Sequence, residues 1–494
     1  MKKFFLPLLS LPLVFILTSC GGGGGSAGVC NGSNSVCFPS SSSNNPPTTS
    51  TTPPPSTTGT TPPTTSTPAP IGKPADFANI CTPSSEKSWA RAHLDDVYLW
   101  YNEIINVPPE NYSTPASYFD ALLVRSRDRF SFTSDKSEID GFFEAGEDVG
   151  YGLRLVNSFG TLRVAYVQPN SPASGQNIQR GAQIIGINGA SITTLSADTQ
   201  IAALYPTKAG ATNRFDILDV GAAGSRTVSL TAATVVGAPV LSNQVITTPD
   251  NKKVGYIVFT DHIATAEDPL IVAVRRFLAI GIDELVIDVR YNGGGYLYIA
   301  NDLASMIGGA RVQNRVFERL QFNDKHPEQT NDPSNRLLFT TIGRSGQFLP
   351  QLNLPRVFLL TTSRTCSASE SIINGLSPFM QVITIGGTTC GKPYGFQQTD
   401  NCTTAYFASR FSGVNDLGQG GYTNGFSPTC SVPDDLDHAL GDTAERQLAS
   451  ALFYAKNGVC SASSFAKAQG LREEIRLPEL DTKRQLWREN RIIK

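Results

Sequence analysis

The alternation of short and long apolar segments between residues 254 and 385 constrains the fold of this 494-residue chain more than any other feature. Short runs rich in β-branched residues alternate there with longer runs in which apolar residues recur at helical spacing. The strand-like runs are Val254–Phe259, Glu284–Val289, Arg356–Thr361 and Val382–Ile385, and the helix-like runs are Leu270–Ala279, Tyr298–Ile307 and Ser369–Pro378. This alternation predicts an α/β core with some parallel strands.

Two regions with other patterns precede this core. Apolar residues recur at helical spacing from Ser85 to Gly146, which predicts an N-terminal helical region. From Val149 to Val236, short β-type runs separated by Gly, Pro and Asn predict a small β-rich module. The predicted divisions are a signal peptide (1–19), an anchor cysteine with a disordered tether (20–75), the helical region (76–146), the β-rich module (147–236), the core (237–460) and a charged tail without an assigned role (461–494).

The first 20 residues have the pattern of a bacterial export signal. Lys2 and Lys3 precede an apolar run too short to span a bilayer, and small residues lead to Cys20. Leu17–Cys20 resembles a lipobox, so we expect acylation of Cys20 and attachment to a membrane through this lipid anchor, with a plain secretory signal as the alternative. The Gly, Ser, Thr and Pro residues that follow predict a tether. We therefore expect an extracytoplasmic protein, and Gly21 in place of an aspartate favours the outer membrane, on its periplasmic or cell-surface face.

Charge and cysteine content exclude some partners. A formal net charge of −2, with no long run of one sign, gives no electrostatic basis for binding nucleic acid. Besides Cys20, eight of the nine cysteines remain and are expected to oxidise outside the cytoplasm. Short separations favour Cys30–Cys37 and Cys402–Cys430, although the sequence does not choose among the pairings. The sequence has no close Cys-x-x-Cys pair and its four histidines are scattered, so we predict no metal site and no cofactor.

Two polar loops are predicted to leave the same edge of the sheet. The strand Arg356–Thr361 leads to Ser367, which opens a helix, and the strand Val382–Ile385 leads to Lys392. A right-handed crossover returns the second strand parallel to the first, so both loops emerge at one edge. This places a hydroxyl nucleophile and an amine within reach of each other. Taken singly, a serine at a helix start is usually an N-cap and a loop lysine is usually a solvated charge.

A third loop is directed at that edge. The strand Glu284–Arg290 ends in Asn292–Gly295, where three glycines let backbone N–H groups approach a ligand closely. A serine, an amine and backbone donors are together the groups that acyl transfer requires. A lysine accepts a proton only when it is neutral, so we expect burial to lower the pKa of Lys392 and no carboxylate to pair with it.

The segments Ser367-Ala-Ser-Glu370, Gly391-Lys392 and Asp288-Val-Arg-Tyr-Asn-Gly-Gly-Gly295 resemble the motifs of the carboxyl-terminal processing peptidases, the S41 family of serine peptidases. The resemblance implies a ClpP/crotonase-like α/β peptidase core with an inserted PDZ-like domain. It also implies the roles of nucleophile for Ser367, of base for Lys392, and of oxyanion hole for the N–H groups of Ala368 and of Gly294 or Gly295. Many relatives carry a glutamine four residues after the lysine. That position is Phe396 here, and we assign the third catalytic role to the neighbouring Gln397.

The β-rich module fits the same family. Its segment Gly150, Tyr151, Gly152 and Leu153 has the Gly-apolar-Gly-apolar form of a PDZ loop that captures a C-terminal carboxylate. The segments Ser171–Ala173 and Gly181–Gly189 are similar to the later PDZ signature. The expected partners are therefore protein or peptide substrates with free C-termini.

The resulting prediction is a serine endopeptidase that acts on extracytoplasmic proteins through Ser367 and Lys392. Cys366 directly precedes the nucleophile and Cys390 nearly precedes the base, so we hypothesise a disulfide that joins the two loops. Two other readings compete with this prediction. One is a catalytically inactive scaffold whose PDZ-like module binds peptides, and the other is a surface adhesin on a Thr/Pro stalk.

Overall fold

The computed structural model describes residues 71–462 and 491–493, which belong to one compact unit. The predicted signal peptide, the acylation of Cys20, the tether and the disulfide Cys30–Cys37 lie outside the described residues, as does most of the predicted tail. In the part of the chain that the structure describes, no helix is long and apolar enough to cross a membrane.

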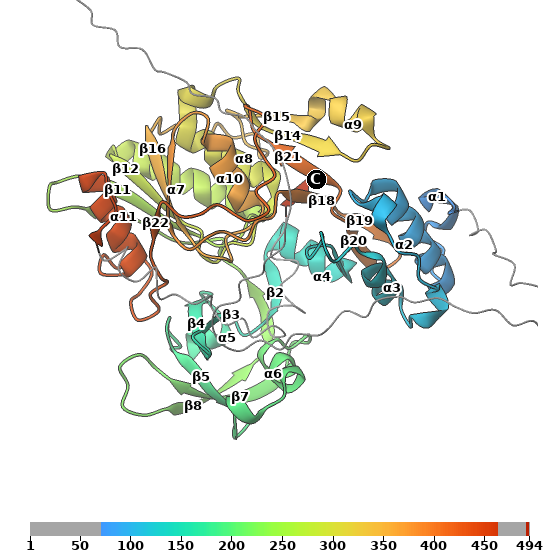
Figure 1. Cartoon of the computed structure of the whole chain (residues 1–494). Coiled ribbons are helices and arrows are strands. Elements are labelled where there is room, and N and C mark those ends of the chain that lie inside the picture. The colour runs from blue at the N-terminus through green and yellow to red at the C-terminus, as the bar shows by residue number, and fades with distance from the viewer. Residues whose placement is uncertain (1–70, 463–490, 494) are drawn as a thin grey trace, which may run out of the picture. The chain divides into compact units, whose positions relative to one another are not determined.

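A six-stranded sheet forms the centre of the α/β core (Figure 1). Its strand order is β10 (Val240–Thr247), β11 (Lys253–Phe259), β12 (Glu284–Asp288), β16 (Arg356–Thr361), β17 (Gln381–Gly386) and β22 (Cys430–Ser431). The strands from β11 to β22 are parallel, and β10 pairs with β11 in the antiparallel direction. The α/β prediction is therefore confirmed, and the four strand-like runs are neighbours in one parallel sheet.

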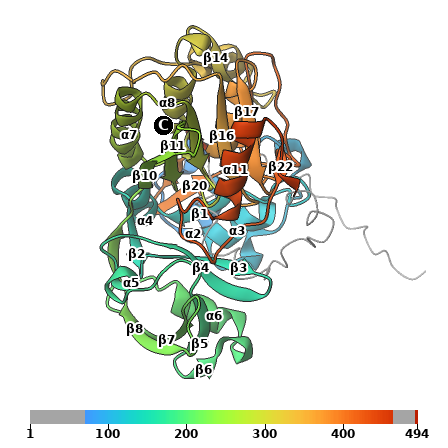
Figure 2. The ribbon, with the colours of Figure 1, turned by 90° about the vertical axis from the view of Figure 1, so that its left-hand side faces the viewer.

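Helices cover both faces of this sheet, because its strands carry apolar side chains on both sides. The helices are α7 (Glu267–Ile280), α8 (Leu297–Gly308) and α10 (Ala368–Leu376) on one face and α11 (Arg446–Asn457) on the other, as Figure 2 shows for α7, α8 and α11. Ile287 and Leu359 are buried with the first group, whereas their neighbours Val286 and Phe358 are buried with α11. Strand alternation thus divides the core into two apolar layers.

Two of the loops that leave the first sheet lead into strands of a second sheet. Its order is β13 (Gly295–Tyr296), β23 (Arg491–Ile493), β18 (Tyr394–Gln397), β21 (Phe411–Val414), β14 (Val316–Phe322) and β15 (Arg336–Leu338). Strand β13 begins in the glycine turn that was predicted after β12, and β18 begins two residues after Lys392. The second sheet therefore fixes where both loops end.

The β-rich module forms a sheet with its own apolar core. The strand order is β3 (Leu153–Ser158), β4 (Thr161–Val167), β5 (Gln183–Ile187), β7 (Thr212–Leu218) and β8 (Arg226–Thr231), with helices α5 (Pro172–Gly175) and α6 (Ala197–Leu204). Val164, Ile184 and Phe215 are among its buried residues. β2 (Glu147–Gly150) pairs with β9 (Ala233–Val236) where the chain enters and leaves the module. β3 lies at the edge of the sheet.

The predicted N-terminal helices are present as α2 (Pro83–Val97) and α3 (Pro115–Leu122). Both helices begin with an N-cap threonine followed by proline, Thr82 and Thr114 respectively, which is a common helix start. They bury Trp89, Leu94 and Phe119 in a shared cluster. The following strand β1 (Phe132–Asp135) pairs with β20 (Thr404–Phe407), which connects the helical region to the core.

The predicted disulfide Cys402–Cys430 is wrong. Cys402 follows the short strand β19 (Thr399–Asn401) and bonds to Cys81, 321 residues earlier in the sequence. Cys430 lies on β22 and bonds to Cys460, which follows α11. Sequence separation misled the prediction because the fold brings Cys402 to a cysteine 321 residues away, while Cys430 pairs with one 30 residues away, and the Cα atoms are 5.7 Å and 5.6 Å apart in the two bridges.

Candidate active site

Ser367 lies in the turn between β16 and α10, at the N-cap position of the helix. Its backbone has φ of 60° and ψ of −114°, which for a residue other than glycine costs on the order of 1–3 kcal/mol. The side chain has no exposed surface, and its Oγ forms no hydrogen bond within the described part of the chain. Local strain and a buried hydroxyl without a partner fit a reactive serine better than a structural one.

Glu370 connects the serine turn to the lysine loop. Its Oε2 accepts hydrogen bonds from the backbone N–H groups of Ser367 and Lys392, both at 2.9 Å. Its Oε1 accepts from the Thr389 hydroxyl at 2.6 Å and from the Gly391 N–H at 2.8 Å. Burial raises the pKa of Glu370, while these donors oppose the rise because they favour the ionised carboxylate. One buried side chain thus positions the backbone of both Ser367 and Lys392.

A disulfide joins the same two loops. Cys366 and Cys390 are bonded, with their Cα atoms 5.1 Å apart, and the Cys390 N–H donates to the Thr365 carbonyl at 3.0 Å. This is the pairing that the sequence suggested. A Glu370 oxygen lies close enough to the sulfur atoms of Cys366 and Cys390 that the three residues could together bind a metal ion. The two sulfur atoms are joined in a disulfide, however, and so do not offer thiolate ligands. The disulfide therefore links the loop that contains Ser367 covalently to the loop that contains Lys392.

We expect reduction of this bridge to lower kcat/KM for peptide cleavage by roughly 10- to 100-fold, because small displacements of reacting groups have effects of that order. Cleavage rates measured before reduction, after reduction and after reoxidation check this. The matched control is the double variant Cys366→Ala and Cys390→Ala, which retains the bridges Cys81–Cys402 and Cys430–Cys460. The hypothesis is wrong if this variant is as active as the oxidised protein.

Lys392 is fully buried beside two aromatic rings. Its Nζ lies 3.7 Å from the centroid of the Phe396 ring and 5.1 Å from that of Phe130. Arg129, next to Phe130 in the chain, donates a hydrogen bond to the Cys390 carbonyl and so holds the lysine loop from the N-terminal region. The Lys392 side chain is therefore buried and lies against two aromatic rings, and burial is the condition that favours a neutral amine.

Gln397 does not face Lys392. It is exposed on β18, whereas Phe396, one residue earlier, is fully buried with its ring against the lysine amine. Successive side chains of a strand point to opposite faces, so only one of the two can face the site. The side chain that faces Lys392 from β18 is thus the aromatic ring of Phe396, and the amide of Gln397 lies on the other face of the strand.

The glycine turn is braced by Asn292, which is fully buried. Its Oδ1 accepts the N–H of Gly294 at 2.9 Å, so this N–H is already used within the turn. Gly295 has φ of 134°, and a Cβ there would lie 2.2 Å from the His262 carbonyl oxygen, so only glycine fits. Of the two predicted oxyanion residues, Gly295 is the one whose N–H is not bonded to Asn292.

His262 was not identified from the sequence. Its Nδ1 lies 2.9 Å from Asn292 Oδ1, and because that oxygen only accepts, the ring donates to it. Burial lowers the pKa of His262 to about 3, so the ring is neutral at physiological pH. The sequence indicated its role only through its position, which is just after β11 and therefore at the same edge of the sheet as the predicted loops. His262 supports the turn through Asn292.

The serine turn and the glycine turn are also tied directly. The carbonyl of Asn292 accepts from the Cys366 N–H and from the Ser369 hydroxyl, both at 3.1 Å. The Thr365 hydroxyl donates to the Val289 carbonyl at 2.8 Å. Ala368, the first residue of α10, is fully buried. The structure therefore brings together the predicted Ser367, Ala368, Lys392 and glycine turn.

The predicted carboxylate loop lines a pocket between the β-rich module and the residues Phe142, Asp261 and Ile263. The lining includes Gly150 to Leu153, the edge strand β3 and the end of α6 at Leu204 and Tyr205. Tyr151 itself points into the module, where its hydroxyl donates to the Ala203 carbonyl at 3.2 Å. An edge strand beside a pocket is the arrangement that adds an extended peptide to a sheet.

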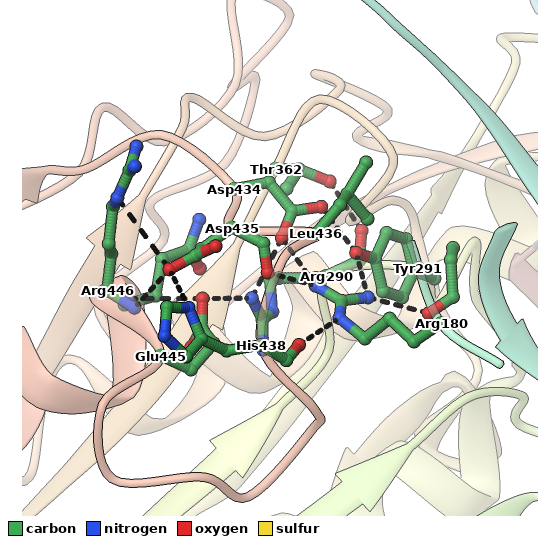
Figure 3. Close-up of polar contacts among 12 residues, drawn as sticks. Arg180, Arg290, Tyr291, Thr362, Asp434, Asp435, Leu436, His438, Glu445 and Arg446 are labelled. Atoms are coloured by element: carbon green, nitrogen blue, oxygen red, sulfur yellow. Dashed lines mark hydrogen bonds and ion pairs between the residues drawn. The ribbon is translucent and has the colours of Figure 1, made fainter. Parts of the chain in front are cut away.

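A buried ionic cluster links this module to the core (Figure 3). Arg180, between α5 and β5, donates to Asp434 Oδ1 at 2.9 Å and to the Tyr291 hydroxyl at 2.7 Å. Arg290 donates to the same Asp434 oxygen at 2.9 Å and to Glu445 at 2.8 Å. Burial alone would raise the pKa of Asp434, but the two guanidinium groups lower it below its ordinary value. The module therefore contacts the residues that directly precede the glycine turn.

Comparisons with known proteins agree with this architecture. The profile of peptidase family S41 matches residues 253–404, that of the peptidase S41 N-terminal domain residues 85–132, and that of the PDZ domain residues 142–211. A carboxyl-terminal-processing protease of Picosynechococcus sp. is 27% identical over 250 residues, which cover 50% of this chain and 55% of that protein. One of Synechocystis sp. is 26% identical over 254 residues, which cover 50% and 53%. This chain thus spans about half the length of the curated relatives it matches.

Among solved structures, an S41-family protein of Bacteroides fragilis is similar at a TM-score of 0.59 and 26% identity, over 76% of this chain and 98% of that one. The N-terminal helices, the PDZ domain and the α/β core together define a peptidase-type fold. The core of this chain therefore matches peptidase family S41, and the curated relatives it resembles are carboxyl-terminal-processing proteases. The predicted family and the predicted PDZ domain are confirmed.

Proposed function

We propose that this chain is a serine endopeptidase of the carboxyl-terminal-processing type. Ser367 attacks the peptide carbonyl while neutral Lys392 accepts its proton, and the lysine then returns the proton to the leaving amine. The N–H groups of Ala368 and Gly295 stabilise the oxyanion, since the N–H of Gly294 is used by Asn292. Hydrolysis of the acyl-enzyme repeats these steps with water as the nucleophile.

The observation that supports this proposal most is that Glu370 accepts hydrogen bonds from the backbone N–H groups of both Ser367 and Lys392. A carboxylate that accepts from both backbones at 2.9 Å fixes the relative position of nucleophile and base. The carbonyl of Asn292 binds the serine turn and so sets the glycine turn against it. Such preorganisation is what acyl transfer requires and what a purely structural sheet edge does not.

The proposal extends to substrate and location. Extracytoplasmic proteins with free C-termini are captured by the PDZ domain at Gly150–Leu153, and Arg180 transmits this binding to the residues before the glycine turn. The protein is exported and anchored through acylated Cys20 on the outer membrane. The three disulfides of the described residues support an oxidising compartment.

Cleavage of an unfolded protein with an apolar C-terminus by soluble protein beginning at Lys73 tests the proposal, with Ser367→Ala as the blank. We expect kcat/KM to fall roughly 10-fold or more when the C-terminal carboxylate is amidated, because charge-assisted hydrogen bonds to the PDZ loop are lost. Mass spectrometry of the products identifies the cleaved bonds. Equal rates for the acid and the amide would exclude C-terminal capture.

A second candidate function is a PDZ scaffold without peptidase activity. The replacement of the usual glutamine by Phe396, and the exposure of Gln397, favour it. In that case the same assay shows no cleavage, while C-terminal peptides still bind to the PDZ domain.

A further inference from the structure

The short strand β23, Arg491–Ile493, lies between the two strands that carry the site. It pairs in parallel with β13, where Gly295 is opposite Arg491 and Tyr296 is opposite Ile492. It also pairs in parallel with β18, where Phe396 is opposite Ile492. One three-residue segment therefore spans the space between the oxyanion turn and the strand that follows the lysine.

Ile492 fills an apolar site in this position. Its side chain is 2% exposed and belongs to the same buried cluster as Tyr296, Phe396 and Phe407. Phe396 is the register partner of Ile492 between β18 and β23, and the Phe396 ring also lies 3.7 Å from Lys392 Nζ. The isoleucine is thus adjacent to a residue that contacts the candidate base.

The edges of β13 and β18 that β23 joins form a slot for one extended chain. A peptide in this slot gains backbone hydrogen bonds from both sides, which is how extended peptides bind to sheet edges. The slot begins at Gly295, where the carbonyl of a scissile bond must meet the oxyanion donor. Ser367 and Lys392 have no exposed surface while β23 is in place. A substrate strand and β23 therefore require the same position.

We propose that β23 occupies the acceptor slot for the substrate strand and closes the site in cis, with Ile492 in a subsite for an aliphatic side chain. The occupant is a segment of this chain, and substrate binds only after it leaves. Competition within one molecule multiplies the apparent KM by the inverse of the open fraction and leaves kcat unchanged, so a protein that is open one-tenth of the time has a KM about tenfold higher. This inference rests on the proposed peptidase function for the position of the substrate strand, and the binding test below is separate from catalysis.

The kinetic test is Ile492→Asp in the full chain, since a buried carboxylate disfavours docking of β23. We expect KM to fall by on the order of tenfold, with kcat unchanged and the melting temperature close to that of the wild type. Ile105→Asp is the matched control, because Ile105 is 79% exposed. Lower activity together with a lower melting temperature would mean that β23 is a structural strand, and would overturn the proposal.

A binding test does not depend on catalysis. A fluorescent peptide of residues 487–494 is titrated onto a Ser367→Ala variant that lacks residues 491–494, and anisotropy is measured. We expect saturable binding, and none by the peptide that carries Ile492→Asp. Absence of binding by the unmodified peptide would overturn the proposal. Binding of the peptide without cleavage of any substrate by any variant would support the slot and reject the peptidase function.

Discussion

Replacement of Ser367 by alanine, or of Lys392 by methionine, is expected to lower kcat/KM for peptide cleavage by on the order of 10⁴-fold or more. In the proposed mechanism alanine removes the attacking oxygen, and methionine keeps the aliphatic stem of the lysine but removes the atom that accepts the proton. Residues that act as one unit have non-additive effects, so the double variant is expected to be no less active than either single variant. Peptide cleavage by purified variants measures all three rates.

Two exposed residues of the same types provide matched controls for this experiment. Ser377→Ala, after the end of α10, and Lys456→Met, near the end of α11, change surface groups and are expected to leave the rate unchanged. Thermal unfolding confirms that each variant is folded. A Lys392→Met variant that retains most of the activity would show that another group is the base.

The parallel sheet could be predicted because its strands are buried on both faces. Glu284–Asp288 and Arg356–Thr361 are almost continuous apolar runs, and this pattern is typical of strands covered by helices on both sides. The second sheet was harder to predict. Its members β13 and β23 have two and three residues, and such short segments acquire strand structure only from their partners.

The site was predictable where the chemistry coincides with strand ends. Ser367, Lys392 and the glycine turn each follow a parallel strand, and parallel strands present their carboxyl ends at one edge. The role of Gln397 depends on which face of β18 it occupies, and one residue of register reverses that face. The bracing of Asn292 by His262 depends on a side-chain contact over 30 residues, which no local pattern encodes.

The disulfides likewise divide into one that could be inferred from the sequence and others that could not. Cys366–Cys390 could be inferred because both residues flank positions that the chemistry had already placed together. Cys81 and Cys402 meet because β19 and β20 extend to the N-terminal region, where β20 pairs with β1. That contact is a consequence of tertiary structure, so it required the fold.

Glu370→Gln is expected to lower kcat/KM by about 100-fold, mainly through kcat, although Glu370 touches no reacting atom. The amide keeps the shape of the side chain, but its NH₂ group cannot accept hydrogen bonds. Either the N–H groups of Ser367 and Lys392 or the donors from Thr389 and Gly391 lose their acceptor. Displacement of nucleophile and base by about 1 Å is enough for an effect of this size.

Separate measurements of KM and kcat distinguish this positioning role from a general loss of structure. The PDZ domain and the slot between β13 and β18 contain none of the groups bonded to Glu370, so substrate affinity is expected to change little. Buried donors without a partner cost about 1–3 kcal/mol each, so thermal unfolding at a lower temperature accompanies the kinetic effect. Glu110→Gln, on an exposed glutamate, is the matched control and is expected to change neither quantity. A Glu370→Gln variant with normal kcat would mean that the disulfide Cys366–Cys390 alone is sufficient to position the serine and the lysine, because it joins the same two loops.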